Sequence, residues 1–211
     1  MFGTNHPRTH PRIGRPLWGE ALRAGGAILE MGVPYSDPVA DGRLIAAVGH
    51  AAVAAGGGVE TALETVRALR ADGHHQPIVA MGYLNPLVAR GVTRSLADMR
   101  AGGIDALIVP DLPAGEDPAF ERQVADAGLG ICFLVTPNSS PDRLERAIGA
   151  STAFLYVVPL YGVTGVRTGI ADTTVPLLQR IRAAVDGRLP VAGGFGISGP
   201  AHVPMLAPAV D

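Results

Sequence analysis

Six short apolar runs recur along this chain of 211 residues, and they restrict its possible folds more than any other feature. The runs span residues 27–32, 77–82, 106–111, 130–135, 153–159 and 190–196. Each is continuously apolar rather than alternating with polar residues, which is typical of strands buried on both faces of a parallel sheet. The sequence therefore predicts six parallel strands.

Amphipathic stretches lie between these runs. Within residues 59–73 the apolar side chains recur at helical spacing, and residues 141–149 open on a Pro–Asp helix-start signal. The repeating unit is therefore strand, loop, helix. That unit fits either a (β/α)₈ barrel or an open doubly wound sheet.

The positions of the polar residues favour the barrel. Polar or glycine residues lie at or near the ends of most of the predicted strands: Glu30, Tyr83, Asn85, Asp111, Thr136, Tyr156, Gly162, Gly194 and Gly196. Functional groups gathered from many strand ends are typical of a barrel mouth. An open sheet would carry a GxGxxG fingerprint after its first strand, and no such motif follows residues 27–32.

Composition and charge exclude several classes of partner. Hydrophobic residues make up 47% and charged residues 17% of the chain, which suits one globular domain. A net charge of -2 gives no basic surface for nucleic acid, and no apolar run approaches the ~20 residues that span a bilayer. The first residues lack the apolar core of a secretory signal, so we expect a cytoplasmic protein.

Two residue types restrict the chemistry. Cys132 is the only cysteine, so no internal disulfide forms, and its apolar surroundings in the sequence predict a buried side chain. All 17 basic residues are arginine, so no lysine is present to form a Schiff base with a carbonyl substrate or with pyridoxal phosphate. Any carbon–carbon cleavage by this chain must use acid/base chemistry.

The segment LEMGVPYSDPVADG, residues 29–42, holds three carboxylates. Glu30 lies among apolar residues, and such burial raises the pKa of a carboxyl group toward neutrality, as a general acid/base requires. A buried ion pair or a strand-end position facing solvent would also explain a glutamate here. Asp37 precedes a proline and suits a turn, whereas Asp41 ends the loop.

This segment resembles the signature of the tryptophan synthase alpha subunit, in which a glutamate ends the second barrel strand and an aspartate follows eleven residues later. Glu30 and Asp41 hold those places. The resemblance continues in the family's order through MGYLNP, IVPDLP, YVVPLYGVTG and GGFGIS, and it covers residues 18–211 as one partial barrel domain after an atypical segment 1–17.

The resemblance implies cleavage of indole-3-glycerol phosphate to indole and glyceraldehyde 3-phosphate without a Schiff base. It assigns to Glu30 the protonation of the indole ring carbon and help in deprotonating the glycerol hydroxyl. Asp41 would bind the indole N–H and stabilise the cation that forms there. Tyr156 matches a tyrosine near the catalytic glutamate, although a packed strand aromatic would look the same.

The same resemblance implies the remaining site residues. It assigns Tyr83, Asp111 and Thr164 to substrate binding. It assigns Gly165, Gly194 and Gly196 to phosphate binding through loop amides, although glycines also form ordinary turns. It implies no cofactor in this chain, with pyridoxal phosphate only in a partner beta subunit of an alpha2-beta2 tetramer.

The ends of the chain depart from the family pattern. The first 17 residues contain no counterpart of strand one, and residues 207–211 stand where the family would begin strand eight. Only strands two to seven are recognisable. We therefore expect an incomplete barrel with two unpaired strand edges. Arg43, where the family usually has proline, and Pro204 in the last helical stretch are smaller departures.

Three other functions remain open at this point. The chain could be a non-catalytic partner that regulates a pyridoxal-phosphate beta subunit, or an inactive truncated remnant. A histidine-pathway isomerase would need paired aspartates on strands one and five, and strand one is not visible.

Overall fold

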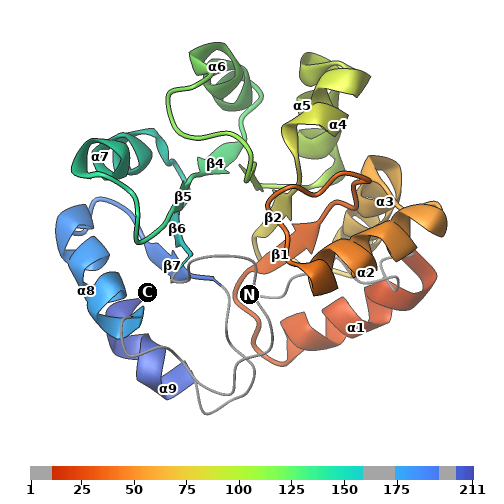
Figure 1. Cartoon of the computed structure of the whole chain (residues 1–211). Coiled ribbons are helices and arrows are strands. Elements are labelled where there is room, and N and C mark those ends of the chain that lie inside the picture. The colour runs from red at the N-terminus through yellow and green to blue at the C-terminus, as the bar shows by residue number, and fades with distance from the viewer. Residues whose placement is uncertain (1–10, 159–173, 195–202) are drawn as a thin grey trace. The chain divides into compact units, whose positions relative to one another are not determined.

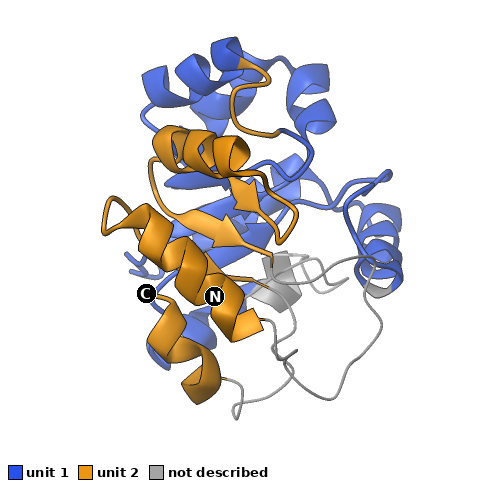
Figure 2. Cartoon of the chain, turned by 60° about the vertical axis from the view of Figure 1, so that its left-hand side comes forward, with its two compact units in different colours: residues 1–112, 118–130 blue, residues 113–117, 131–211 orange. Residues whose placement is uncertain are grey.

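The computed structural model describes residues 11–158, 174–194 and 203–211 (Figure 1). The chain divides into two compact units (Figure 2). Unit 1 comprises residues 1–112 and 118–130, and unit 2 comprises residues 113–117 and 131–211. Strands pair in parallel in both units, which confirms the predicted α/β class.

Unit 1 alternates strands with helices along the chain. Its elements are α1 (Pro11–Arg23), β1 (Leu29–Gly32), α2 (Arg43–Ala54), α3 (Val59–Ala71), β2 (Ile78–Met81), α4 (Leu84–Arg90), α5 (Val92–Gly102), β3 (Ala106–Ile108) and α6 (Pro118–Asp126). The next strand, β4 (Gly130–Cys132), begins at its last residue. No helix of the described residues is long and apolar enough to cross a membrane.

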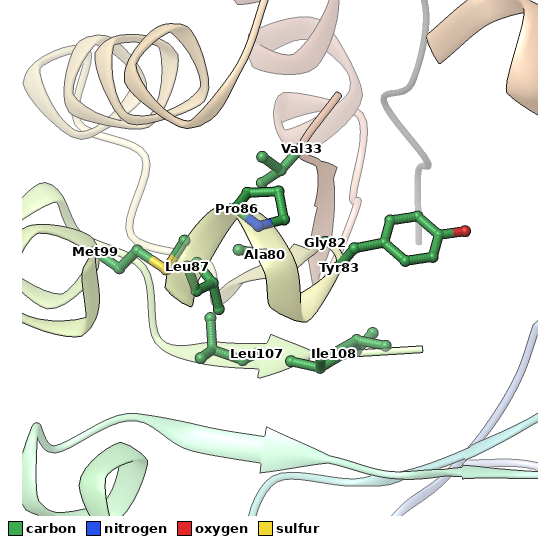
Figure 3. A pocket seen from close by; sticks show the side chains of 10 residues that line it. Val33, Ala80, Gly82, Tyr83, Pro86, Leu87, Met99, Leu107 and Ile108 are labelled. Atoms are coloured by element: carbon green, nitrogen blue, oxygen red, sulfur yellow. The ribbon is translucent and has the colours of Figure 1, made fainter. Parts of the chain in front are cut away.

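The register of the first three strands divides their side chains between two faces. Glu30 of β1 lies opposite Val79 of β2, and Val79 lies opposite Ala106 of β3. The neighbouring residues Ala80 and Leu107 line a small cavity of about 10 Å³ that α4 and α5 also border (Figure 3). Because side chains alternate along a strand, Glu30 points to the opposite face, away from α4 and α5.

The amphipathic stretch 59–73 forms α3, as its spacing predicts. Leu63, Val66 and Leu69 are all buried on one face of this helix. Helix α1 packs against α3, and its Trp18 and Leu22 are each 3% exposed. Periodic apolar side chains thus attach both helices to the unit's core.

Arg70, in the last turn of α3, binds the segments that lead into β2 and β3. Its guanidinium donates to the carbonyl oxygens of His74, Gln76 and Gly103 at 2.7–3.1 Å and to Asp105 Oδ2 at 2.7 Å. Asp105 Oδ2 also accepts the N–H of Ile78, the first residue of β2, at 2.8 Å. One side chain therefore satisfies the backbone at the amino ends of two strands.

Gly103 allows this close approach. Its φ of +96° lies in the left-handed region, and a Cβ built there would lie 2.8 Å from Arg70 Cγ. Both the backbone conformation and the contact with Arg70 require glycine at this helix end.

Unit 2 holds the second sheet, in the order β5-β6-β7. After the last two residues of β4 come β5 (Leu134–Val135), α7 (Pro141–Ala150), β6 (Leu155–Val157), α8 (Thr174–Val185), β7 (Val191–Gly193), α9 (Val203–Leu206) and the short 3₁₀ turn Ala207–Ala209. Helix α7 forms where its start signal predicts. The hydroxyl of Ser140 accepts the N–H of Arg143, and Pro141 occupies the first helical position.

The predicted strand 130–135 is wrong in one respect, because it forms two strands, β4 and β5, that break at Phe133. The N–H of Phe133 donates to Ser151 Oγ at 3.1 Å instead of to a neighbouring strand. Its carbonyl still accepts the N–H of Tyr156. β4 belongs to the sheet β1-β2-β3-β4, whereas β5 pairs with β6 in the second sheet, so the chain passes from one sheet to the other at this break. Cys132, just before the break, is buried as predicted.

Candidate active site

Glu30 is a buried carboxyl group in the middle of a strand. It lies second in β1, between Leu29 and Met31, and its residue is 6% exposed. This confirms that the glutamate is neither at a strand end nor turned to solvent. The short side chain of Ala106 lies two strands away on the same face. A carboxyl group in such surroundings is suited to exchanging a proton with a bound substrate.

Asp41 lies in the loop that follows β1, and its main partner is Tyr83. The two side chains are hydrogen-bonded to each other, and Tyr83 Oη also accepts the N–H of Ala40 at 3.1 Å. Burial raises the pKa of Asp41, and the hydrogen bond from Tyr83 partly offsets that rise. The structure thus brings together two of the residues that the sequence assigned to the site.

Two further contacts hold Tyr83 in place. The ring of Tyr35 packs against it, with centroids 5.5 Å apart, and Tyr35 Oη accepts a hydrogen bond from Asn85 at 2.7 Å. The carboxylate of Asp111, after β3, accepts the N–H of Leu84 at 3.1 and 3.3 Å. Asp111 therefore holds the first residue of α4, next to Tyr83. Its assignment to substrate binding stays a prediction.

Tyr156 and Gly194 meet in unit 2. Tyr156 lies in β6, is 3% exposed, and its ring neighbours that of Phe154 at 6.3 Å. Gly194 directly follows β7, and its N–H donates to the carbonyl of Val157. A Cβ built on Gly194 would lie 2.2–2.3 Å from the phenol ring and hydroxyl of Tyr156. Glycine is therefore required here by space, whatever its role toward phosphate.

A Gly194→Ala variant should lose about 1–3 kcal/mol of stability, because the added methyl group overlaps a buried ring that cannot move freely. Urea unfolding of both proteins measures the difference. Gly149→Ala is the matched control, since a Cβ on this exposed residue of α7 meets nothing within 4 Å. Equal stability of the two variants would contradict the overlap with Tyr156.

The remaining predicted site residues, Thr164, Gly165 and Gly196, lie outside the described residues, as does Gly162. Among the residues that the structure describes, no three His, Cys, Asp or Glu side chains gather into a group that could hold a metal ion. The predicted site residues that the structure describes therefore offer carboxyl, phenol and backbone groups within each unit.

The sequence did not reveal that Tyr83 binds Asp41. The two residues are far apart in the sequence, and no motif joins them. The only available signal was that both follow neighbouring parallel strands, whose carboxyl ends meet at one edge of the sheet. That signal predicts proximity but not which atoms bond.

Comparison with known proteins gives a consistent result. The family model described as tryptophan synthase alpha chain matches residues 18–211. The alpha chain of Gluconacetobacter diazotrophicus is 46% identical over 177 residues, which cover 84% of this chain. That match spans 64% of the relative's own length, slightly less than two thirds. The alpha chain of Geotalea daltonii is 39% identical over 189 residues, covering 90% of this chain and 70% of the relative.

Solved structures agree with these matches. A structure of the tryptophan synthase a2b2 complex from Pyrococcus furiosus aligns with a TM-score of 0.87 and 33% identity, over 99% of this chain and 82% of that chain. Tryptophan synthase subunit alpha from Legionella pneumophila aligns with a TM-score of 0.84 and 27% identity, over 100% and 76%. These similarities confirm the predicted TIM-barrel fold class and the family resemblance.

Proposed function

Because this chain belongs to the tryptophan synthase alpha chain family, a family of lyases in tryptophan biosynthesis, we propose that it cleaves indole-3-glycerol phosphate itself. One observation carries the proposal. A buried carboxyl group, Glu30, lies in β1, and a half-buried one, Asp41, lies in the following loop with a hydrogen bond from Tyr83. Release of indole from indole-3-glycerol phosphate by the purified chain tests it.

The cleavage needs one proton delivered and one removed. Glu30 protonates the indole ring carbon that bears the glycerol chain, which places positive charge on the ring nitrogen. Loss of the proton from the adjacent glycerol hydroxyl then forms the aldehyde as the carbon–carbon bond breaks. The bonding electrons return to the ring, giving indole and glyceraldehyde 3-phosphate. One carboxyl group in a water-poor setting can serve both proton transfers.

Asp41 stabilises the intermediate in this scheme. An ionised carboxylate that accepts the indole N–H lies where the positive charge develops, so it favours the transition state over the neutral substrate. Burial raises the pKa of Asp41, so its ionised form is lost at a higher pH than for an exposed aspartate as the pH falls. Activity should therefore decline on the acid side as Asp41 becomes protonated.

An Asp41→Asn variant should lose about 10²- to 10³-fold in kcat, because an amide accepts the N–H bond without balancing the cation. Steady-state indole release gives kcat, and competition by glycerol phosphate reports on the phosphate end of the site. Binding of glycerol phosphate should change little. An equal loss of that affinity would place Asp41 elsewhere. Asp37→Asn, an exposed residue of the same loop, is the control.

Phosphate binding is proposed for the loop amides of Gly165, Gly194 and Gly196, and substrate binding for Thr164. The ring of Tyr83 contributes to the substrate pocket, and Asp111 supports it by holding the start of α4. Tyr156, which lies beside Gly194, is proposed as a catalytic residue, as the family resemblance implies. Backbone amides can hold a phosphate dianion without lysine or arginine.

A beta subunit is the proposed protein partner. The loop after β1 carries Val39 at 72% exposure, and α4 carries Val88 at 53% exposure. The hydrogen bond from the Ala40 N–H to Tyr83 joins this loop to the segment that enters α4. The proposal rests on the similarity to the solved a2b2 complex, and these two side chains are its candidate contact residues. Pyridoxal phosphate would belong to that partner, this chain would hold no cofactor, and both would act in the cytoplasm.

A second candidate, regulation of a beta subunit without catalysis, uses the same surface. The two functions are separated by two independent assays. Indole release from the isolated chain reports catalysis, and stimulation of a purified beta subunit reports regulation. Stimulation with no indole release by the chain would favour the second function.

A further inference from the structure

The hydroxyl of Tyr83 has two partners from one loop. It accepts the N–H of Ala40 and is hydrogen-bonded to the carboxyl group of the next residue, Asp41. A phenol has one proton to donate and lone pairs to accept with, so accepting from Ala40 leaves its proton for the Asp41 carboxylate. Both bonds fix the loop relative to the end of β2.

Tyr83 is itself held firmly. The residue is 6% exposed, its ring packs against Tyr35, and it stands just before α4, whose first N–H is bound by Asp111. In Figure 3 its ring extends away from the small apolar cavity beside β2 and β3. The loop adds its own turn, in which the N–H of Asp41 donates to the carbonyl of Pro38 at 3.0 Å.

We propose that Tyr83 is a positioning residue for the cleavage reaction, which acts through Asp41 by holding its carboxylate from the end of β2. The same contact favours the ionised form of Asp41. This inference rests on the proposed function of Asp41. It assigns the hydroxyl of Tyr83 a task separate from any contact of its ring with the substrate. In this scheme the Asp41 carboxylate accepts the indole N–H and stabilises the positive charge on the ring. A single hydrogen bond from Tyr83 holds the carboxylate and leaves its other lone pairs for the indole N–H.

Charges around the pair fit this task. The pKa of Tyr83 is raised by burial and by the negative charges of Asp41 and Asp111, so the phenol keeps its proton throughout the neutral range. The pKa of Asp41 is raised by burial and lowered by Tyr83. When the phenol hydroxyl is removed, only burial acts on the pKa of Asp41, so that pKa rises. Asp41 then becomes protonated at a higher pH.

The test compares Tyr83→Phe with the unaltered chain across pH 5.5–9, measuring kcat and KM for indole release. Phenylalanine keeps the ring and removes only the hydroxyl. At the acid end kcat should fall by roughly 10- to 100-fold, because a hydrogen bond to a charged group is lost. The deficit should shrink as the pH rises, while KM changes little. Tyr35→Phe is the control, since its hydroxyl contacts Asn85 rather than Asp41.

Direct titration of Asp41 by carboxyl NMR keeps the inference independent of activity. In Tyr83→Phe the Asp41 signal should titrate at a higher pH than in the unaltered chain, and in Tyr35→Phe it should not move. An unchanged Asp41 titration, or a loss of kcat that is equal at every pH, would overturn the proposal. If the unaltered chain releases no indole, the proposed function fails, but the titration still decides whether Tyr83 governs Asp41.

Discussion

A Glu30→Gln variant should lose about 10³-fold or more in indole release while its folded structure persists. Glutamine has the same shape but can neither give up nor take a proton, and the proposed cleavage requires both steps from this one side chain. General acid/base groups commonly contribute 10²- to 10⁴-fold each.

The measurement is kcat for indole release, with circular dichroism and thermal unfolding recorded on the same samples. Glu64→Gln is the matched control, because Glu64 is an exposed glutamate on α3 and its change should leave kcat unaltered. If Glu30→Gln kept more than a few per cent of the original turnover, Glu30 would not be the acid/base group. Loss of activity together with loss of the folded signal would show a structural role.

An Arg70→Met variant should lose about 2–4 kcal/mol of stability. Methionine keeps much of the side chain's length and apolar stem but cannot donate, so three backbone carbonyls lose this donor and Asp105 keeps only the N–H of Ile78 and the more distant Arg100. A part-buried carbonyl without a donor has lost its water and gained no hydrogen bond in return, which lowers the free energy of unfolding. Arg70→Lys should recover only part of the loss, because one ammonium cannot reach acceptors spread around a planar guanidinium.

Urea unfolding followed by circular dichroism measures this effect. Arg94→Met is the control, since Arg94 is 73% exposed and pairs with Asp98 only at 3.7 Å. Exposed pairs of this kind contribute little, so the control should change stability by less than about 0.5 kcal/mol. Similar unfolding curves for the two variants would contradict the structural importance of the Arg70 contacts.

Strand positions were largely predictable from the sequence because each strand is buried on both faces. Continuous apolar runs mark such strands clearly, and every predicted run contains a strand of the structure. The break at Phe133 was not predictable. It depends on the hydroxyl of Ser151, a residue beyond the next helix, which takes the N–H that a strand partner would otherwise receive.

The burial of one candidate site residue was predictable from the sequence, but the contacts among the candidate residues were not. Burial of Glu30 follows from its apolar neighbours in the sequence, and the structure confirms it. The pairing of Asp41 with Tyr83 depends on how the loop after β1 folds toward β2, which local sequence patterns do not determine. The Arg70 contacts escaped prediction for a similar reason, since four of its five hydrogen bonds are to backbone carbonyls.

The same strand, β2, connects these two groups of contacts. Arg70 and Asp105 fix the backbone where β2 begins at Ile78, and Tyr83 binds Asp41 just past the point where β2 ends at Met81. The contacts that stabilise the fold and the contacts proposed to serve the reaction thus lie at opposite ends of one four-residue strand. Substitutions near Tyr83 therefore leave the contacts that anchor the start of β2 in place, and stronger contacts at Ile78 can be engineered without changing the residues of the proposed site.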